Sequence, residues 1–244
     1  MQQIELDILS MNIWSDKYLQ KERTQWLIQY IEKTNPDIIC LQEVTNNNII
    51  DLVLMFKKQG YQYRISNEKR HVFEVIACKW KIQDWKFQKF STSAHDNGML
   101  YCDIGANDNI ITIASGNIDT SNKGNEQLQC ALNFLANKNH YIIYGCTSHL
   151  QNEQYIFKNQ RWLDAWINAG KNKLYEHTVD FTKNNNVIEK LTTRPDRIFI
   201  QGECNIYKYE LVGTLPICST SFTSTLKTHP STHFGITCRI NFHL

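Results

Sequence analysis

The feature that most constrains the fold is a short apolar run at residues 36–44, PDIICLQEV, which ends in a glutamine and a glutamate. Residues 16–34 precede it and carry large apolar side chains at helical spacing, and residues 48–58 follow with a second helical pattern. An apolar run of this length between two helices is typical of a strand that is buried on both faces. The sequence therefore predicts a strand that ends at Glu43 and packs inside a layered structure.

The rest of the chain predicts a mixed α/β protein that is rich in strands. Residues 4–13 alternate between apolar and polar, as a half-buried strand does. Several strand-like segments follow between residues 61 and 115, then helices at 127–137 and 161–168, and more strands up to residue 242. We see no internal repeat and no linker, so we expect a single domain over residues 1–244 with a substantial core.

Composition restricts the function only slightly. The formal net charge is +2, so nucleic-acid binding would need a local basic patch. None of the eight cysteines forms a C-x-x-C pair, and several lie in apolar runs, which favours reduced thiols in an intracellular, reducing compartment. We find no targeting segment and no apolar run long enough for membrane insertion. The asparagine clusters at 46–48 and 184–186 are typical of polar loops, and we assign them no function.

In order, the motifs along the chain resemble the endonuclease/exonuclease/phosphatase superfamily. They are ILSMNIW, PDIICLQEV, ITIASGNIDTS, IIYGCTS, LDAW, HTVD, TRPDRIFI and STHFGI, and they cover nearly the whole sequence. Within the superfamily the chain looks most like the metal-dependent tyrosyl-DNA phosphodiesterases. The resemblance implies a two-sheet α/β sandwich with helices on the outer faces. It also implies hydrolysis of phosphate esters assisted by Mg²⁺, which takes oxygen ligands and often one or two carboxylates.

Four site residues of the family have a counterpart in this chain. Asn12 matches the amide on the phosphate side, and Glu43 matches the metal carboxylate. Asp196 matches the aspartate that supports the catalytic histidine, and His233 matches that histidine. The resemblance therefore implies catalytic roles for Asn12, Asp196 and His233, which would be vestigial in an inactive protein.

Four other positions depart from the family pattern. Asn117 replaces the usual histidine, Cys146 replaces the aspartate of the G-D-x-N motif, Ser148 replaces its asparagine, and Thr232 replaces the aspartate of the S-D-H motif. A thiol is a poor ligand for Mg²⁺, and general-base help is worth roughly 10²–10⁴-fold. Only Glu43 remains as a matched metal carboxylate. Asp119 and His149 lie close enough in the sequence to compensate if the alignment is shifted by one or two residues.

These departures favour a pseudoenzyme that serves as a structural or accessory subunit of a larger assembly, with protein partners and no cofactor. Such a subunit should expose an apolar surface. One alternative is an active Mg²⁺-dependent phosphodiesterase on nucleic acid or phosphotyrosyl adducts. Another is a module that binds phosphate or nucleic acid without cutting it. The pair Asp196–His233 is either a working dyad or a hydrogen bond that only joins two strand ends. The lysines at 79, 81, 86 and 89 are either a nucleic-acid contact or an edge strand protected by charge.

Overall fold

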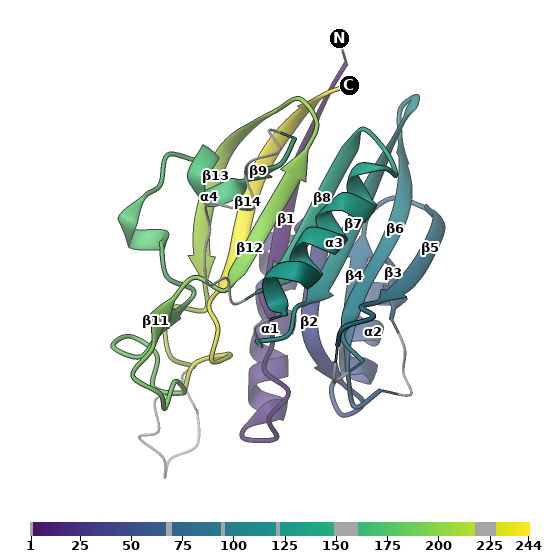
Figure 1. Ribbon diagram of the computed structural model, residues 1–244. Coiled ribbons are helices and arrows are strands. Elements are labelled where there is room, and N and C mark those ends of the chain that lie inside the picture. Colours follow the sequence, from purple (N-terminus) through teal and green to yellow (C-terminus); the bar gives the residue numbers. More distant parts are fainter. Residues whose placement is uncertain (1, 67–69, 94–95, 121–122, 149–160, 218–227) are drawn as a thin grey trace.

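The computed structural model describes residues 2–66, 70–93, 96–120, 123–148, 161–217 and 228–244. Two six-stranded sheets stack on each other (Figure 1). The first sheet has the spatial order β13 (Cys204–Val212), β14 (Gly235–His243), β1 (Gln3–Asn12), β2 (Ile38–Thr45), β4 (Val72–Cys78) and β3 (Gln62–Ile65). The second has the order β5 (Ile82–Lys89), β6 (Gly98–Ala106), β7 (Asn109–Asn117), β8 (Tyr141–Thr147), β12 (Asp196–Gln201) and β9 (Leu163–Asp164).

Helices cover the outer faces of the two sheets. These are α1 (Gln20–Thr34) and α2 (Ile49–Lys58) on the first sheet and α3 (Gly124–Ala136) on the second, with the short α4 (Ala165–Asn168) after β9. A two-stranded hairpin, β10 (Val179–Asp180) and β11 (Thr192–Thr193), stands apart from both sheets (Figure 1). The expected two-sheet α/β sandwich with helices outside is confirmed.

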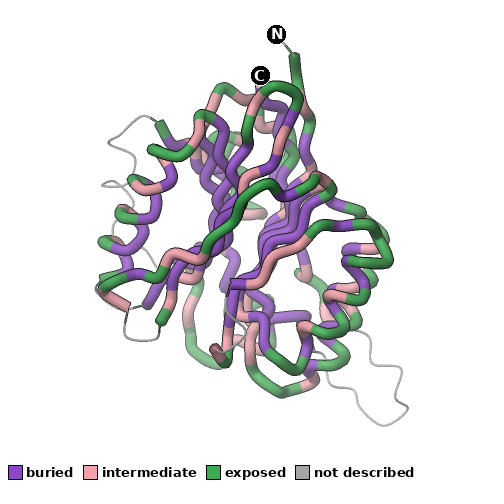
Figure 2. The backbone as a smooth tube through the Cα atoms, turned by 90° about the vertical axis from the view of Figure 1, so that its right-hand side faces the viewer, coloured by how far each residue is buried: buried purple, intermediate pink, exposed green. Residues whose placement is uncertain are grey.

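The core has three layers because successive side chains of a strand point to opposite faces. On β1, Leu6 and Ile8 pack between the sheets, whereas Leu9 and Met11 pack against α1 and α2. A third cluster lies between the second sheet and α3. The central strands are accordingly buried along most of their length, whereas the edge strands β3, β5 and β13 are largely exposed or half-buried, as are many helix and loop residues (Figure 2).

Two parallel strand pairs bring the ends of four strands to one end of the sandwich. β1 runs parallel to β2 with Asn12 beside Gln42, and β7 runs parallel to β8 with Asn117 beside Thr147. β12 is antiparallel to β8, so its first residue, Asp196, is the register partner of Thr147. The opposite end of the sandwich holds both chain termini (Figure 1).

The helix expected from Asp16 begins only at Gln20. Arg23, in the first turn of α1, explains the difference. Its buried guanidinium donates hydrogen bonds to the carbonyls of Ile13, Trp14, Asp16 and Tyr18. The guanidinium also lies 4.4 Å from the centre of the Trp14 ring. Burial lowers the pKa of Arg23 to about 10, although Asp16 and Glu43 favour its charged form. Carbonyls bound to this side chain are not bound by helical N–H groups, so the segment before α1 stays a loop.

The helix expected at residues 161–168 is reduced to the four residues of α4. Asp164 accepts hydrogen bonds from the N–H groups of Trp166 and Ile167, as an N-cap residue does. Its carboxylate also pairs with Arg194 and Arg197, which holds Asp164 in a short strand against β12. The helix can therefore begin only after Asp164.

The two sheets approach each other closely near the site end. A Cβ atom on Gly145 would lie 2.5 Å from Ser10 Oγ and 3.0 Å from Cys40 Cβ, so only glycine fits there. Gln42 fills the neighbouring space, and its amide donates to Ser115 Oγ at 3.0 Å and to the Gly145 carbonyl at 3.3 Å. These contacts hold β2 against β7 and β8 directly beneath the strand ends that carry the site.

Lys86 and Lys89 lie on β5, which forms one border of the second sheet, whereas Lys79 and Lys81 precede that strand. The seven cysteines in the described residues are all free thiols. None of the helices in the described residues is long and apolar enough to cross a membrane.

Candidate active site

Asn12 and Glu43 meet at the ends of β1 and β2. Asn12 Nδ2 donates to Glu43 Oε1 at 2.9 Å, and Asn12 Oδ1 accepts from the Trp14 N–H at 2.9 Å. Glu43 Oε2 accepts from both the N–H and the hydroxyl of Ser15, at 3.0 and 3.1 Å. The Glu43 carboxylate is therefore already bound by three donor groups of the protein.

A β-bulge turns Glu43 toward Asn12. Regular alternation would place Glu43 on the same face as Leu41, which packs under the helices. The pairing of β2 with β4 shifts register between Leu41 and Val44, and Glu43 has a left-handed φ of 60°. Non-glycine residues adopt this conformation rarely, and such positions cluster at functional sites. The bulge thus gives the carboxylate a direction that strand periodicity does not predict.

The buried Asp196 and the half-buried His233 form a hydrogen-bonded pair. His233 Nδ1 lies 2.8 Å from Asp196 Oδ2. Two threonines hold the carboxylate in place: Thr147 donates to Oδ1 at 2.8 Å and Thr178 donates to Oδ2 at 2.6 Å. Thr147 Oγ1 also lies 3.4 Å from Asn12 Nδ2. Thr147 therefore links the Asn12–Glu43 pair to the Asp196–His233 pair.

Electrostatics keeps the second pair in its charged form. Burial alone would raise the pKa of Asp196, but the charge of His233 and hydrogen bonds from His233, Thr178 and Thr147 outweigh it and lower that pKa. Burial alone would lower the pKa of His233, but Asp196 and, more weakly, Glu43 raise it above its ordinary value. The site therefore favours a cationic imidazole against an anionic carboxylate.

The four positions that depart from the family pattern do not all join this group. Asn117, at the end of β7, lines a cavity of about 520 Å³ together with Glu43 and Ser15. Cys146 is fully buried in the cluster beneath α3, and burial raises the pKa of its thiol. Because side chains alternate along β8, Thr147 faces Asn12 and Asp196 whereas Cys146 faces away from them.

Ser148 and Thr232 contribute no side-chain hydrogen bond to this group among the described residues. Ser148 is buried, and its hydroxyl has no hydrogen-bond partner within the part of the chain that the structure describes. Thr232 is half-buried and precedes His233. Its main-chain carbonyl accepts a hydrogen bond from Asn184 Nδ2 at 3.2 Å.

Asp119, one of the two suggested substitute groups, has several hydrogen-bond partners outside the site. Asp119 is buried, and its oxygens accept hydrogen bonds from Ser93, Asn97 and Gln127 at 3.1, 2.6 and 3.0 Å. The bond to Gln127 connects the end of β7 to α3, and those to Ser93 and Asn97 connect it to the segment between β5 and β6. These contacts stabilise the fold around Asp119. His149 lies outside the described residues.

The residues present do not fit a magnesium ion well. Mg²⁺ binds carboxylate oxygens and waters in octahedral geometry. Both oxygens of Glu43 accept hydrogen bonds from the protein, and both oxygens of Asp196 do so as well. Within the described residues no group of three or more histidine, cysteine, aspartate or glutamate side chains is placed to hold a metal ion.

Sequence reasoning missed several residues that build the site. Ser15, Thr147 and Thr178 hold the two carboxylates, but a serine or threonine carries no distinctive pattern in a sequence. Thr178 lies in HTVD, a stretch that marked the family resemblance without suggesting a role. Asn184 lies in a loop, as its cluster predicted, but it is fully buried and its amide donates to the carbonyl of the residue before His233, a role that the sequence did not suggest.

One curated relative and several solved structures are similar to this chain. The chain is 21% identical over 239 residues to tyrosyl-DNA phosphodiesterase 2 of Gallus gallus, a match that covers 91% of this chain. The chain spans only about 62% of the length of that relative. No family model matches the sequence.

Solved structures match over almost the full chain. The truncated TDP2 of Caenorhabditis elegans gives a TM-score of 0.84 at 19% identity and covers 98% of both chains. TDP2 of Danio rerio, in complex with a single-strand DNA product, gives 0.81 at 18% identity, with 97% and 98% covered. An endonuclease/exonuclease/phosphatase family protein of Bacteroides thetaiotaomicron gives 0.81 at 14% identity, with both chains fully covered. The chain therefore has the endonuclease/exonuclease/phosphatase fold, in the form shared with tyrosyl-DNA phosphodiesterase 2.

Proposed function

We propose that this chain is a pseudoenzyme of the endonuclease/exonuclease/phosphatase superfamily that serves as an accessory or structural subunit of a larger assembly. The observation that carries the proposal is that the hydrogen bonds of the matched metal carboxylate, Glu43, are made within the protein. Glu43 is the only matched carboxylate on the metal side, and Asn12 and Ser15 already bind both of its oxygens. Cys146, at the position of the family's second carboxylate, is enclosed beneath α3. These two observations support the proposal, since Mg²⁺ prefers carboxylate ligands and a general base activates water in metal-dependent hydrolysis.

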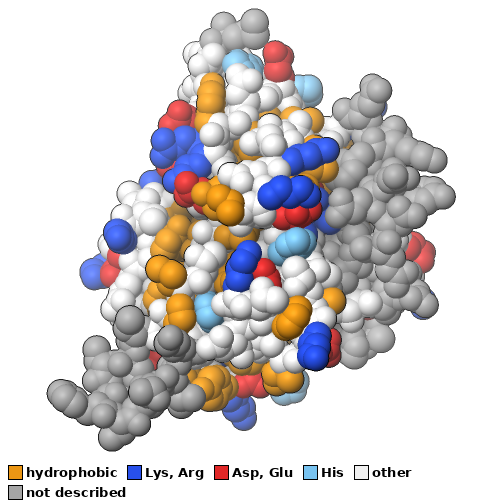
Figure 3. All heavy atoms as spheres, turned by 90° about the vertical axis from the view of Figure 1, so that its left-hand side faces the viewer, with side chains coloured by type: hydrophobic (Ala, Val, Ile, Leu, Met, Phe, Trp, Pro, Cys, Tyr) orange, Lys and Arg blue, Asp and Glu red, His pale blue; other side chains and the backbone are white. Residues whose placement is uncertain are grey.

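Exposed apolar side chains support a role in an assembly. Ile50 and Leu54 lie one turn apart on α2 and are 67% and 61% exposed. On the face that carries β13 and the β10–β11 hairpin, hydrophobic side chains alternate with charged ones and form no single large patch (Figure 3). The surface of α2 is therefore the better support for a protein partner. The free thiols of the described cysteines fit an intracellular, reducing compartment.

A hydrolysis assay tests the proposal. Purified protein would be incubated with single-stranded DNA that bears a 5′-phosphotyrosyl group, and with a generic phosphodiester, with and without Mg²⁺ or Mn²⁺. We expect no metal-dependent turnover above that of the Glu43→Ala variant, because one occupied carboxylate leaves no metal site. Turnover that requires the metal and disappears in Glu43→Ala would establish the active phosphodiesterase instead. Recovery of the native protein from its source as a free monomer would contradict the accessory role.

A second candidate function is the binding of phosphate groups without cleavage. The observation that favours it is the retained Asp196–His233 pair, in which the pKa of His233 is raised. A protonated imidazole is a suitable partner for an anionic oxygen. Under this function the protein would bind 5′-phosphorylated single strands with an affinity that falls steeply with salt concentration.

A further inference from the structure

His233 lies in an irregular segment, residues 228–234, that leads into β14. His229, Pro230 and Ser231 are buried there, yet no strand or helix pairs their main-chain groups. Buried carbonyl groups need hydrogen-bond partners, because an unpaired one in the interior destabilises the fold. The conformation of the segment that carries His233 therefore depends on which donors reach these carbonyls.

Two asparagine side chains provide those donors. Asn184 Nδ2 donates to the carbonyl of Ser231 at 2.9 Å and to that of Thr232 at 3.2 Å. Asn186 Nδ2 donates to the carbonyl of His229 at 2.9 Å and lies 3.4 Å from that of Ser231. Together the two amides bind the carbonyls at three positions of the segment, including the residue directly before His233.

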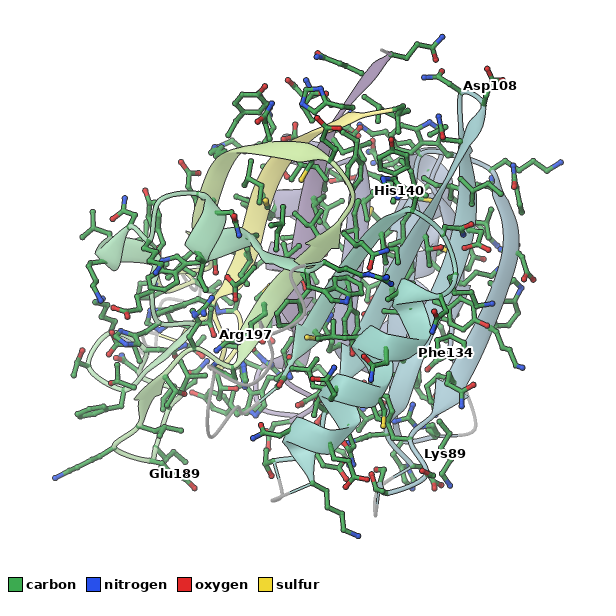
Figure 4. All side chains as sticks on the ribbon, turned by 45° about the horizontal axis from the view of Figure 1, so that its top comes forward. Lys89, Asp108, Phe134, His140, Glu189 and Arg197 are labelled. Carbon is green, nitrogen blue, oxygen red and sulfur yellow. The ribbon has the colours of Figure 1, made fainter. Side chains whose placement is uncertain are left out.

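The loop that carries the asparagines is itself fixed. Asn184 N–H donates to the Asp180 carbonyl at 2.9 Å, and Asn184 Oδ1 accepts from the N–H of Asn186 at 3.0 Å. Asp180 accepts from the hydroxyl of Thr182 and pairs with Lys183. This loop joins β10 to β11 and lies beside the start of β14, and Glu189 at its far end extends into solvent (Figures 1 and 4).

The hydrogen bonds continue from the segment to the site. Ser231 Oγ donates to the Asn12 carbonyl at 2.8 Å and accepts from the N–H of His233 at 3.1 Å. On the other side of His233, the N–H of Phe234 donates to the Thr178 carbonyl at 2.7 Å. Thr178 is the residue whose hydroxyl holds Asp196. The main chain is thus bound immediately before and after His233.

We propose that Asn184 and Asn186 are positioning residues, which form an amide clamp that holds the segment 228–234 so that the imidazole of His233 stays against Asp196. The proposal deepens the phosphate-binding function above, because only a fixed imidazole presents its second nitrogen to an anion in one geometry. The two asparagines touch neither Asp196 nor the imidazole in any contact described above, so they act through the main chain of the segment.

The test is an NMR titration of the histidine ring signals in the protein without ligand. The groups that face His233 and raise its pKa are Asp196 and Glu43, so this pKa reports whether the contact with Asp196 is intact. In Asn184→Ala we expect the pKa of His233 to fall by about one unit, a tenfold change in its protonation equilibrium. Asn186→Ala should lower this pKa less, because Asn186 binds the carbonyls of His229 and Ser231 and not that of Thr232, the residue next to His233. Asp196→Asn sets the value expected when the carboxylate charge is absent.

Asn137→Ala is the matched control. Asn137 also donates its amide to a main-chain carbonyl, that of Asn133, at 2.9 Å, but it lies at the end of α3. This variant should leave the pKa of His233 unchanged. If Asn184→Ala does not fold, Asn186→Ala alone decides the question.

A pKa of His233 equal to the wild-type value in both Asn184→Ala and Asn186→Ala would overturn the clamp, whatever their loss of stability. The same samples, titrated with inorganic phosphate, separate this proposal from the binding function. If wild-type protein does not bind phosphate but the pKa of His233 falls in the asparagine variants, the binding function is rejected and the clamp is supported. Phosphate binding of equal affinity in wild type and both variants would reject the clamp and keep the binding function.

Discussion

Replacing Asp164 with asparagine should lower the free energy of unfolding by about 3–5 kcal/mol. The carboxylate is 2% exposed and lies 2.8 Å from Arg194 Nη1 and 3.0 Å from Arg197 Nη1. Arg197 is buried and lies on β12 (Figure 4). Asparagine keeps the shape and the N-cap oxygen of Asp164 but removes the negative charge that both buried guanidinium groups share.

Chemical denaturation at neutral pH would measure this loss. Asp164→Ala should lose about 0.5–2 kcal/mol more than Asp164→Asn, because alanine also removes the cap of α4. The exposed pair Lys208–Glu210, 2.8 Å apart, is the control, and Glu210→Ala should change stability by about 1 kcal/mol or less. Equal stabilities of Asp164→Asn and Glu210→Ala would show that the buried charge cluster contributes little.

Replacing Cys146 with aspartate should destabilise the protein by about 3–5 kcal/mol without creating hydrolytic activity. The family has aspartate at this position, but Cys146 is completely buried here, in one cluster with Tyr144, Trp162 and Phe199. A carboxylate there loses its hydration. It would also compete with Asp164 for Arg197, the register partner of Cys146 on β12.

The pH dependence of the stability of Cys146→Asp shows whether the buried negative charge causes its loss of stability. Burial raises the pKa of a carboxyl group in the folded state, so the penalty is present above the pKa of the unfolded state, about 3.9 for aspartate. The deficit of Cys146→Asp relative to wild type should therefore shrink as the pH falls toward that value. Cys146→Ser, of similar size and neutral, should lose less and show no such pH dependence. A Cys146→Asp protein as stable as wild type, with new metal-dependent turnover, would show that Cys146 replaced a working catalytic group.

The sequence predicted the elements whose side chains follow a simple period. Residues 38–45 form the buried strand expected from PDIICLQEV, and the strand expected at residues 4–13 is Gln3–Asn12, of which residues 8–12 are all buried rather than alternating. The two-sheet sandwich was implied by the resemblance to the endonuclease/exonuclease/phosphatase superfamily. The same resemblance implied a common site for Asn12, Glu43, Asp196 and His233.

The sequence could not predict features that depend on one irregular residue or on a distant partner. Alternation places Glu43 under the helices, and only the bulge with its left-handed φ turns the carboxylate to Asn12. Arg23 and Asp164 each delay the start of a helix by binding groups from other parts of the chain. No local pattern contains these partners, so the predicted helix boundaries were wrong.

By itself the sequence determined the fold class and the four matched residues, because strand period and motif order are local properties of the chain. The tertiary structure alone decided which substitutions lie in the site. It placed Asn117 at the cavity, enclosed Cys146 beneath α3, gave Asp119 partners of its own, and placed Asn184 behind His233. The physical reason is that the face of a strand and the satisfaction of a buried carbonyl are fixed only when distant segments pack together.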